Sequence, residues 1–195
     1  MKFDIILPSI GRPSLRDALD SVFAQDYKDW NLYVYEQGSI TDLNVYHANG
    51  VQAFTYWNDV IVRNDYGAHA RNCMISYARN PWIAYIDDDD IWSPNHLSTL
   101  RDLLLVNPEA TMLHTAGQSF SWKHRSPRSK RLARKLGAIN STDTLTVGMA
   151  HTRELFSKTQ GWQPCDNHDK LLWQEMLLSG GKPATSDTVT FQFER

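Results

Sequence analysis

The sequence predicts an α/β fold in which a mostly parallel central sheet is flanked by helices. Three observations support this fold class. Short apolar runs resemble buried strands, stretches with a helical apolar period lie between them, and polar turns separate the two. The chain has 195 residues, of which 42% are hydrophobic, a size and composition that suit one domain with a sizeable core. We therefore expect a single α/β domain over residues 1–195.

The N-terminal elements read as strand, helix and strand. Residues 3–7 form a nearly continuous apolar run closed by Pro8, as expected of a strand buried on both faces. Ser14 is placed to cap a helix over residues 15–23, whose apolar side chains recur on one face. Residues 31–36 are rich in Leu, Val and Tyr and predict the next strand. This order implies two parallel strands.

The middle of the chain continues the alternation. Between residues 40 and 66 two short runs, 54–57 and 60–62, compete for one strand. A helical stretch begins at Gly67, and residues 82–86 form a further apolar strand. Ser93 and Pro94 are typical of a helix start, and that helix ends before Pro108.

The C-terminal part predicts two strands around one helix. Residues 111–114 and 189–193 have the composition of strands. Asp166 or Asn167 can cap a helix from about residue 168 to residue 178, and Gly180 follows its end.

Cysteine usage and hydropathy indicate a reduced, cytoplasmic protein. Cys73 and Cys165 lie far apart and predict neither a disulfide framework nor a zinc site. No apolar run reaches the roughly 18–20 residues that span a bilayer, so we expect no transmembrane segment. Asp4 stands where a signal peptide requires apolar residues.

Charge is divided unevenly along the chain, although the net charge is only −2. Residues 1–109 hold 15 acidic and 8 basic residues, a net charge of −7. Residues 110–195 hold 7 acidic and 12 basic residues, a net charge of +5. The two parts therefore meet ligands of different charge.

Four consecutive aspartates, Asp87 to Asp90, directly follow the predicted strand 82–86. Adjacent carboxylates repel one another unless a cation or hydrogen-bond donors offset their charge. Ligands of parallel α/β sheets bind beyond the carboxyl ends of the strands, which is where this cluster stands. In extended chain, Asp87 and Asp89 would point to the same side. Carboxylates suit Mg²⁺ or Mn²⁺, which commonly bind substrate phosphates too, so we predict a metal held against a diphosphate.

Three motifs resemble those of a known family. They read LPSIGRP at residues 7–13, NDYGAHARN at 64–72 and IDDDDIWSP at 86–94. Together they resemble the family 2 nucleotide-sugar glycosyltransferases of the GT-A fold, over residues 3–100 and again over 161–181. The resemblance implies a GT-A-like domain and a metal-dependent, inverting transfer of a sugar from a nucleoside-diphosphate sugar to an acceptor hydroxyl. Residues 1–109 would bind nucleotide sugar and metal, and 110–195 would supply the acceptor side and the catalytic base.

The resemblance also implies roles for donor-site residues. Pro8, Ser9 and Glu36 would contact the base and ribose, although EQGS at residues 36–39 replaces the family's usual DDGS. Asp89 would be the main ligand of Mn²⁺ or Mg²⁺. Asp87 would help to hold the metal or the ribose, and Asp88 would support the donor site.

Arg71 matches the Arg of the family's Ala-Arg-Asn motif and would meet a phosphate or the ribose. By residue type alone, Arg71 could equally be a surface arginine of its helix.

The general base is implied by HDKLLW at residues 168–173, where the family usually has Glu-Asp followed by apolar residues and Leu-Trp. Asp169 matches the catalytic Asp, and His168 replaces the Glu. Without the resemblance, Asp169 would simply complement a helix N-terminus. His168 could tune Asp169 or be an inert neighbour, and His151 could reach the diphosphate or the metal or be structural.

The acceptor side contains a basic stretch, residues 123–135, with seven cations and no acidic residue. Trp122, Arg128, Lys130 and Arg131 are the candidate contacts to an acceptor or a phosphate. The stretch could close over the donor diphosphate, or it could bind an anionic acceptor such as a polysaccharide, a phosphorylated polymer, nucleic acid or a membrane surface. Alternative functions are a non-catalytic nucleic-acid-binding protein that retains the fold, and a nucleotidyltransferase.

Overall fold

The computed structural model describes residues 1–38, 41–43, 46, 54–61, 63–121, 126–127 and 145–194. In these ranges nine strands form one sheet. The strands are β1 (Phe3–Ser9), β2 (Trp30–Gln37), β3 (Phe54–Asp59), β4 (Trp82–Tyr85), β5 (Ile91–Trp92), β6 (Met112–Ser121), β7 (Ser126–Pro127), β8 (Met149–Thr152) and β9 (Pro183–Glu194). The helices are α1 (Leu15–Phe23), α3 (Ala68–Tyr77), α4 (His96–Val106), α6 (Arg153–Phe156) and α7 (His168–Leu178).

The strand order across the sheet is β3-β2-β1-β4-β8-β6-β9-β5, with β7 paired to β6. The longest pairings, β1 with β2 and β6 with β9, are parallel, whereas β8 runs antiparallel to both β4 and β6. All seven residues of β1 are buried, which explains its nearly continuous apolar run. The predicted α/β class and mostly parallel sheet are confirmed.

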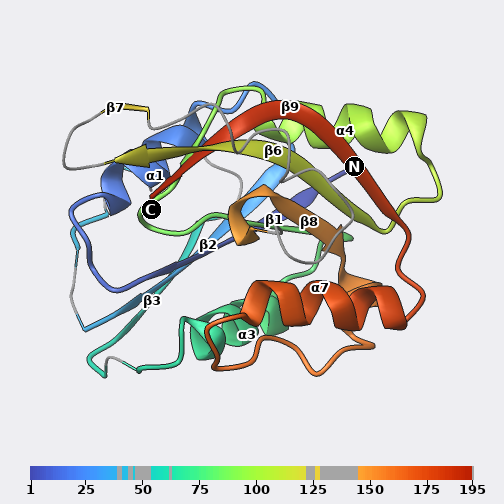
Figure 1. Ribbon diagram of the computed structural model, residues 1–195. Coiled ribbons are helices and arrows are strands. Elements are labelled where there is room, and N and C mark those ends of the chain that lie inside the picture. Colours follow the sequence, from blue (N-terminus) through green and yellow to red (C-terminus); the bar gives the residue numbers. More distant parts are fainter. Residues whose placement is uncertain are drawn as a thin grey trace.

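Helices cover both faces of the sheet (Figure 1). Leu15 and Leu19 of α1 pack with Leu97 and Leu100 of α4 in the core on one face. Helices α3 and α7 lie on the opposite face, where Met176 and other α7 side chains enter a second core. Of the helices in the described ranges, none is long and apolar enough to cross a bilayer.

Most predicted elements are present, but their extents differ from the expectation. Strands β6 and β9 are longer than the predicted runs 111–114 and 189–193. Both strands contain small and polar residues that have no strand-like pattern of their own and that join the sheet through the pairing of β6 with β9. Strands β5 and β8 were not predicted, since two and four residues carry too little pattern. The competition between 54–57 and 60–62 is resolved by β3, which pairs with β2 and ends before the exposed Val60.

The predicted helix caps are wrong. Ser14 has helical backbone angles, and its side chain makes no capping hydrogen bond. Asn167, at the corresponding position of α7, likewise makes no side-chain cap. Packing of the helices on the sheet therefore holds these ends without the side-chain bond that the sequence pattern suggested.

Candidate functional site

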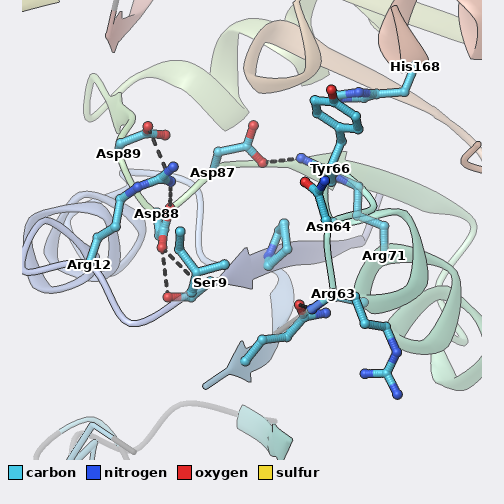
Figure 2. Close-up of a pocket in the computed structure, with 15 residues that line it drawn as sticks. Ser9, Arg12, Arg63, Asn64, Tyr66, Arg71, Asp87, Asp88, Asp89 and His168 are labelled. Carbon is cyan, nitrogen blue, oxygen red and sulfur yellow. Dashed lines mark hydrogen bonds and ion pairs between the residues drawn. The ribbon is translucent and has the colours of Figure 1, made fainter. Parts of the chain in front are cut away.

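A cavity of about 450 Å³ lies at the edge of the sheet where β1, β2 and β4 end (Figure 2). These strands run parallel, so the residues at their carboxyl ends come side by side. Further lining residues come from the loop before α3, from α3 itself and from the first residue of α7. The lining residues are Pro8, Ser9, Ile10, Arg12, Gln37, Arg63, Asn64, Tyr66, Gly67, Ala70, Arg71, Asp87, Asp88, Asp89 and His168.

Asp88 fixes the loop between β1 and α1. Its side chain is 2% exposed and accepts hydrogen bonds from Ser9 Oγ at 2.8 Å and from the backbone N–H of Ile10 at 3.0 Å. The guanidinium of Arg12 donates to its other oxygen. The Asp88 carboxylate is thereby occupied by hydrogen-bond donors of the protein, and it shapes the wall of the cavity.

Arg71 is a buried arginine rather than the surface arginine that its residue type left open. Its side chain is 4% exposed, and its guanidinium pairs with Asp87 and donates to the carbonyl of Tyr66 at 2.6 Å. The indole of Trp162 lies against it, 4.7 Å from the guanidinium carbon. Gly67 makes room, because a Cβ there would stand 2.8 Å from Arg71 Nη1. The structure thus holds one cation rigidly beside Asp87.

Asp87 to Asp90 form a turn, in which the backbone N–H of Asp90 donates to the carbonyl of Asp87 at 3.1 Å. The expected extended geometry is therefore wrong, yet Asp87 and Asp89 both face the cavity (Figure 2). Burial raises the pKa of Asp89 to about 6, and the charge of Asp87 adds to this effect. Arg12 Nη1 lies 3.3 Å from Asp89 Oδ2 and acts in the opposite direction. The site therefore favours additional positive charge.

The carboxylates at the cavity can hold a divalent cation only if a bound ligand supplies further oxygen atoms. Two carboxylates, Asp87 and Asp89, face the cavity. Across the described ranges, no group of three or more His, Cys, Asp or Glu side chains is arranged to hold a metal ion. Two carboxylates completed by phosphate oxygens are a common Mg²⁺ or Mn²⁺ environment, so the residues fit an ion that arrives with a diphosphate.

The first turn of α7 brings His168 to the cavity, and the side chain of the next residue, Asp169, lies near the His168 imidazole. His168 Nδ1 lies 2.9 Å from the carbonyl of Cys165, which can only accept, so Nδ1 carries the proton. His168 Nε2 consequently faces Asp169 Oδ1 at 3.5 Å. The side chains of His168 and Asp169 are 15% and 19% exposed. The imidazole and the carboxylate thus form a pair at the rim of the cavity.

Glu36 does not line the cavity, contrary to its expected contact with the base. Its carboxylate accepts from the backbone N–H and the hydroxyl of Thr41, at 2.9 and 2.6 Å, and from Tyr56 Oη at 2.6 Å. Gln37 lines the cavity instead. Strand alternation could have indicated this exchange, because neighbours in β2 point to opposite faces of the sheet. Three further residues of the site were not predicted from the sequence, namely Arg12, Tyr66 and Trp162.

His151 does not reach the cavity. It is fully buried on β8, with Nδ1 3.0 Å from the carbonyl of Thr152 and Nε2 2.7 Å from Tyr85 Oη. Burial lowers the pKa of His151 to about 4, so it is neutral. Of the two roles left open for His151, the structural one is supported, because His151 packs and hydrogen-bonds within the core, and the contact with a diphosphate or metal is wrong.

The remaining predicted residues divide into two groups. Pro8 and Ser9 line the cavity, and their contact with a base and ribose stays a prediction. Trp122, Arg128, Lys130 and Arg131 lie outside the described residues, as does most of the basic stretch.

A family model described as "Glycosyl transferase family 2" matches residues 4–161. This chain belongs to glycosyl transferase family 2. The family match includes every cavity residue except His168, and Asp169 also lies beyond it.

A curated relative supports the assignment to family 2. The chain is 31% identical over 107 residues to the UDP-Glc:alpha-D-GlcNAc-diphosphoundecaprenol beta-1,3-glucosyltransferase WfgD of Escherichia coli. That match covers 53% of this chain and 41% of WfgD. The family 2 chain thus spans about two fifths of the length of this relative.

Solved structures share the fold of this family 2 chain. S. aureus TarS in complex with UDP matches with a TM-score of 0.79 and 14% identity, over 100% of this chain and 61% of the TarS chain. Mannosyltransferase PcManGT from Pyrobaculum calidifontis, in complex with GDP-Man and Mn²⁺, matches with a TM-score of 0.76 and 18% identity, over 97% of this chain and 56% of that chain. At such identities the likeness concerns the fold alone.

Proposed function

We propose that this family 2 domain binds a nucleoside-diphosphate sugar in the cavity and transfers the sugar to an acceptor hydroxyl with inversion. The observation that carries this proposal is the convergence of Arg71, Asp87 and Asp89 on one cavity at the carboxyl ends of parallel strands. Neighbours in fold were solved with UDP, UDP-GlcNAc or GDP-Man, which supports a nucleotide-sugar donor.

Asp89 and Asp87 are the residues that would hold a divalent cation, Mn²⁺ or Mg²⁺, together with oxygens of the diphosphate. When bound, such an ion stabilises the negative charge that develops on the departing diphosphate. Arg71 adds a fixed positive charge on the same side of the cavity and needs no reorganisation, because Asp87, Tyr66 and Trp162 already hold it.

Asp169 is the proposed general base. The acceptor hydroxyl would give its proton to the Asp169 carboxylate while its oxygen forms a bond to the anomeric carbon. The bond from that carbon to the diphosphate oxygen breaks, and its electron pair leaves with the diphosphate. His168 Nε2, at 3.5 Å, is placed to share the transferred proton with Asp169 Oδ1, because Nδ1 is committed to the Cys165 carbonyl.

The chemical class of the acceptor is predicted from the charge of the basic stretch. An anionic acceptor such as a polysaccharide, a phosphorylated polymer or a modified DNA base would suit residues 123–135 by charge. Within the described ranges, no observation favours the alternative of a non-catalytic nucleic-acid-binding protein or of a nucleotidyltransferase over sugar transfer.

Turnover of a panel of nucleotide sugars tests the proposed function. The wild-type chain should release nucleoside diphosphate from at least one donor in the presence of Mn²⁺, and Asp89→Asn should reduce that turnover by about a hundredfold or more. Calorimetric titration of Mn²⁺ with the nucleoside diphosphate present should show weakened binding of the ion by the same variant.

Asp102→Asn is the matched control, because Asp102 is an exposed aspartate of α4 that pairs with its neighbour Arg101. It should retain wild-type turnover. The proposed function would be abandoned if no nucleoside diphosphate bound to the wild-type chain.

A further inference from the structure

Two guanidinium groups that line the cavity, those of Arg12 and Arg71, differ in their freedom to move. The Arg71 side chain is 4% exposed and is held by Asp87, by the carbonyl of Tyr66 and by the indole of Trp162. The Arg12 side chain, in contrast, is 44% exposed. Exposed side chains change rotamer rapidly, so Arg12 can exchange its partners whereas Arg71 is fixed.

Arg12 lies between two of the carboxylates that follow β4 (Figure 2). Its Nη1 hydrogen-bonds to Asp88 Oδ1 and lies 3.3 Å from Asp89 Oδ2. The other oxygen of Asp88 already accepts from Ser9 Oγ and from the backbone N–H of Ile10. Arg12 therefore helps to anchor the loop between β1 and α1 through Asp88, and it is at the same time a counter-ion of Asp89.

The contact between Arg12 and Asp89 competes with a metal ion. Asp89 is one of the two carboxylates proposed to hold a divalent cation, and a cation at its Oδ2 would stand within a few ångströms of the guanidinium and be repelled by it. The charged side chains at this edge contribute three negative and two positive charges, a net charge of −1; they are Asp87, Asp88, Asp89, Arg12 and Arg71. A free divalent cation consequently gains less here than it would without a resident guanidinium beside Asp89.

A bound diphosphate changes this competition. Phosphate oxygens are strong acceptors for a guanidinium, and Arg12 lines the same cavity in which the diphosphate would lie. Arg12 can thus exchange the Asp89 carboxylate for a phosphate oxygen, and the divalent cation takes the place of the guanidinium at Asp89. Because Arg71 is held on three sides, the same exchange is not open at Asp87.

We propose that Arg12 is a resident counter-ion of Asp89, which a divalent cation displaces and which the diphosphate then receives. This inference rests on the proposed function, because it assumes that the ligand contains a diphosphate. Arg12 makes the two binding events interdependent, so that the ion and the nucleotide each raise the affinity for the other by the same factor. It thereby disfavours an ion that arrives alone and favours an ion that arrives with its nucleotide.

Binding of Mn²⁺ to the nucleotide-free chain tests the inference. Arg12→Gln removes the charge and keeps an N–H donor, so calorimetric titration should show that the variant binds Mn²⁺ roughly tenfold more tightly than the wild type. Without the ion, the same variant should bind UDP or GDP, whichever the wild type prefers, roughly tenfold more weakly. A general disturbance of the site would weaken both affinities, so opposite changes identify a displaced counter-ion. An Mn²⁺ affinity no higher than that of the wild type would overturn the inference.

Arg16→Gln is the matched control for the loss of one positive charge. Arg16 is an exposed arginine of α1 that contacts the carbonyl of Asp42 at 3.3 Å and does not line the cavity. This variant should keep both wild-type affinities. If it gained as much Mn²⁺ affinity as Arg12→Gln, the effect would come from net charge, and the role assigned to Arg12 would be wrong.

Arg12→Lys is a second variant that keeps a positive charge for the buried Asp88. Its ammonium ends one bond short of the position of Nη1, so it can stay with Asp88 but loses the contact with Asp89. The Mn²⁺ affinity should again rise, by a smaller factor than in Arg12→Gln. Thermal melting verifies that each variant is folded, and absence of any gain in the folded variants would contradict the proposal.

Failure of this inference can be distinguished from failure of the proposed function. If the wild-type chain bound UDP or GDP together with Mn²⁺, and loss of Arg12 left the Mn²⁺ affinity unchanged, only the role of Arg12 would be removed. Absence of nucleoside diphosphate binding by the wild-type chain would remove the proposed function itself.

Discussion

Two polar clusters in this domain satisfy their polar groups in different ways. The charged edge, composed of Arg12, Arg71, Asp87, Asp88 and Asp89, pairs carboxylates with guanidinium groups. The neutral chain runs from Trp162 through Tyr85 and His151 to the carbonyl of Thr152 without any charge.

The neutral chain is directional. Trp162 Nε1–H donates to Tyr85 Oη at 3.3 Å, and the Tyr85 hydroxyl donates to His151 Nε2 at 2.7 Å. His151 Nδ1–H then donates to the Thr152 carbonyl at 3.0 Å. Each N–H and O–H group of the neutral chain donates one hydrogen bond, and the bond from Tyr85 needs an unprotonated His151 Nε2 as its acceptor. A protonated His151 has no acceptor at Nε2 and would lose the hydrogen bond from Tyr85.

The difference shows where this fold tolerates charge. The charged side chains of the charged edge lie at the cavity, where a charged ligand can share them, whereas the neutral chain consists of groups that are partnered by hydrogen bonds alone. The two clusters meet at Trp162, whose indole touches Arg71 and whose N–H begins the neutral chain. Substitutions at the charged edge should therefore change activity, and those in the neutral chain should change stability first.

The largest expected effect concerns Asp169, at the rim of the cavity beside the charged edge. Asp169→Asn should reduce sugar transfer by roughly 10²–10⁴-fold, the usual contribution of a general base. Nucleotide affinity and thermal stability should stay close to those of the wild type, because Asp169 does not line the donor cavity. Steady-state kinetics with the preferred donor measure the loss, and calorimetric titration measures the affinity.

Asp187→Asn, at an exposed position of β9, is the control for this charge removal and should be neutral. Full transfer activity in Asp169→Asn would place the base elsewhere.

The next effect tests whether the neutral chain must remain neutral. Burial lowers the pKa of His151 to about 4 in the folded state, against about 6.5 when unfolded. The unfolded chain therefore binds this proton first as pH falls, so stability is lost between pH 6.5 and pH 4. The pKa difference corresponds to roughly 3 kcal/mol. Urea unfolding of wild type and His151→Phe at pH 7 and pH 4.5 should show a smaller acid loss in the variant.

Phe156→Leu separates titration from packing, since Phe156 stacks on His151 without titrating. It should be less stable at both pH values yet keep the wild-type pH dependence. A wild-type pH dependence in His151→Phe would show that His151 does not contribute to acid unfolding.

A smaller effect is expected where the two clusters meet. Trp162→Leu removes the aromatic face beneath the Arg71 guanidinium and the hydrogen bond to Tyr85, so nucleoside diphosphate affinity should fall about tenfold. Trp162→Phe restores the aromatic face only and should recover most of that loss. If both variants bound the nucleoside diphosphate as tightly as the wild type, Trp162 would have no part in positioning Arg71.

The smallest effect distinguishes backbone strain from crowding of Arg71. Gly67 and Gly180 both have positive φ angles, 75° and 87°, so replacement by Ala should cost each about 1 kcal/mol of stability. A Cβ at Gly67 would stand 2.8 Å from Arg71 Nη1, whereas one at Gly180 would meet nothing within 4 Å. Chemical denaturation should therefore report similar losses, and titration should report weaker nucleotide binding for Gly67→Ala alone.

The sequence by itself determined the fold class, the central strands and the position of the acidic cluster. These features rest on local patterns, since β1 is buried on both faces and must be apolar throughout. Helix α7 was predicted with the right bounds because Gly180 marks its end and its apolar residues extend over the whole helix. The aspartates at residues 87–90 were found because charge so close to a buried strand is itself a signal.

Only the tertiary structure decided which polar residues meet the cavity. The choice of Gln37 over Glu36 depends on which face of β2 the ligand approaches, and the burial of Arg71 depends on Trp162, ninety-one positions away in the chain. His151 was separated from the site by its place on β8, a strand too short to be recognised without its partners β4 and β6. Contacts between distant segments have no local pattern, and for that reason the sequence does not predict which of these residues meet the cavity.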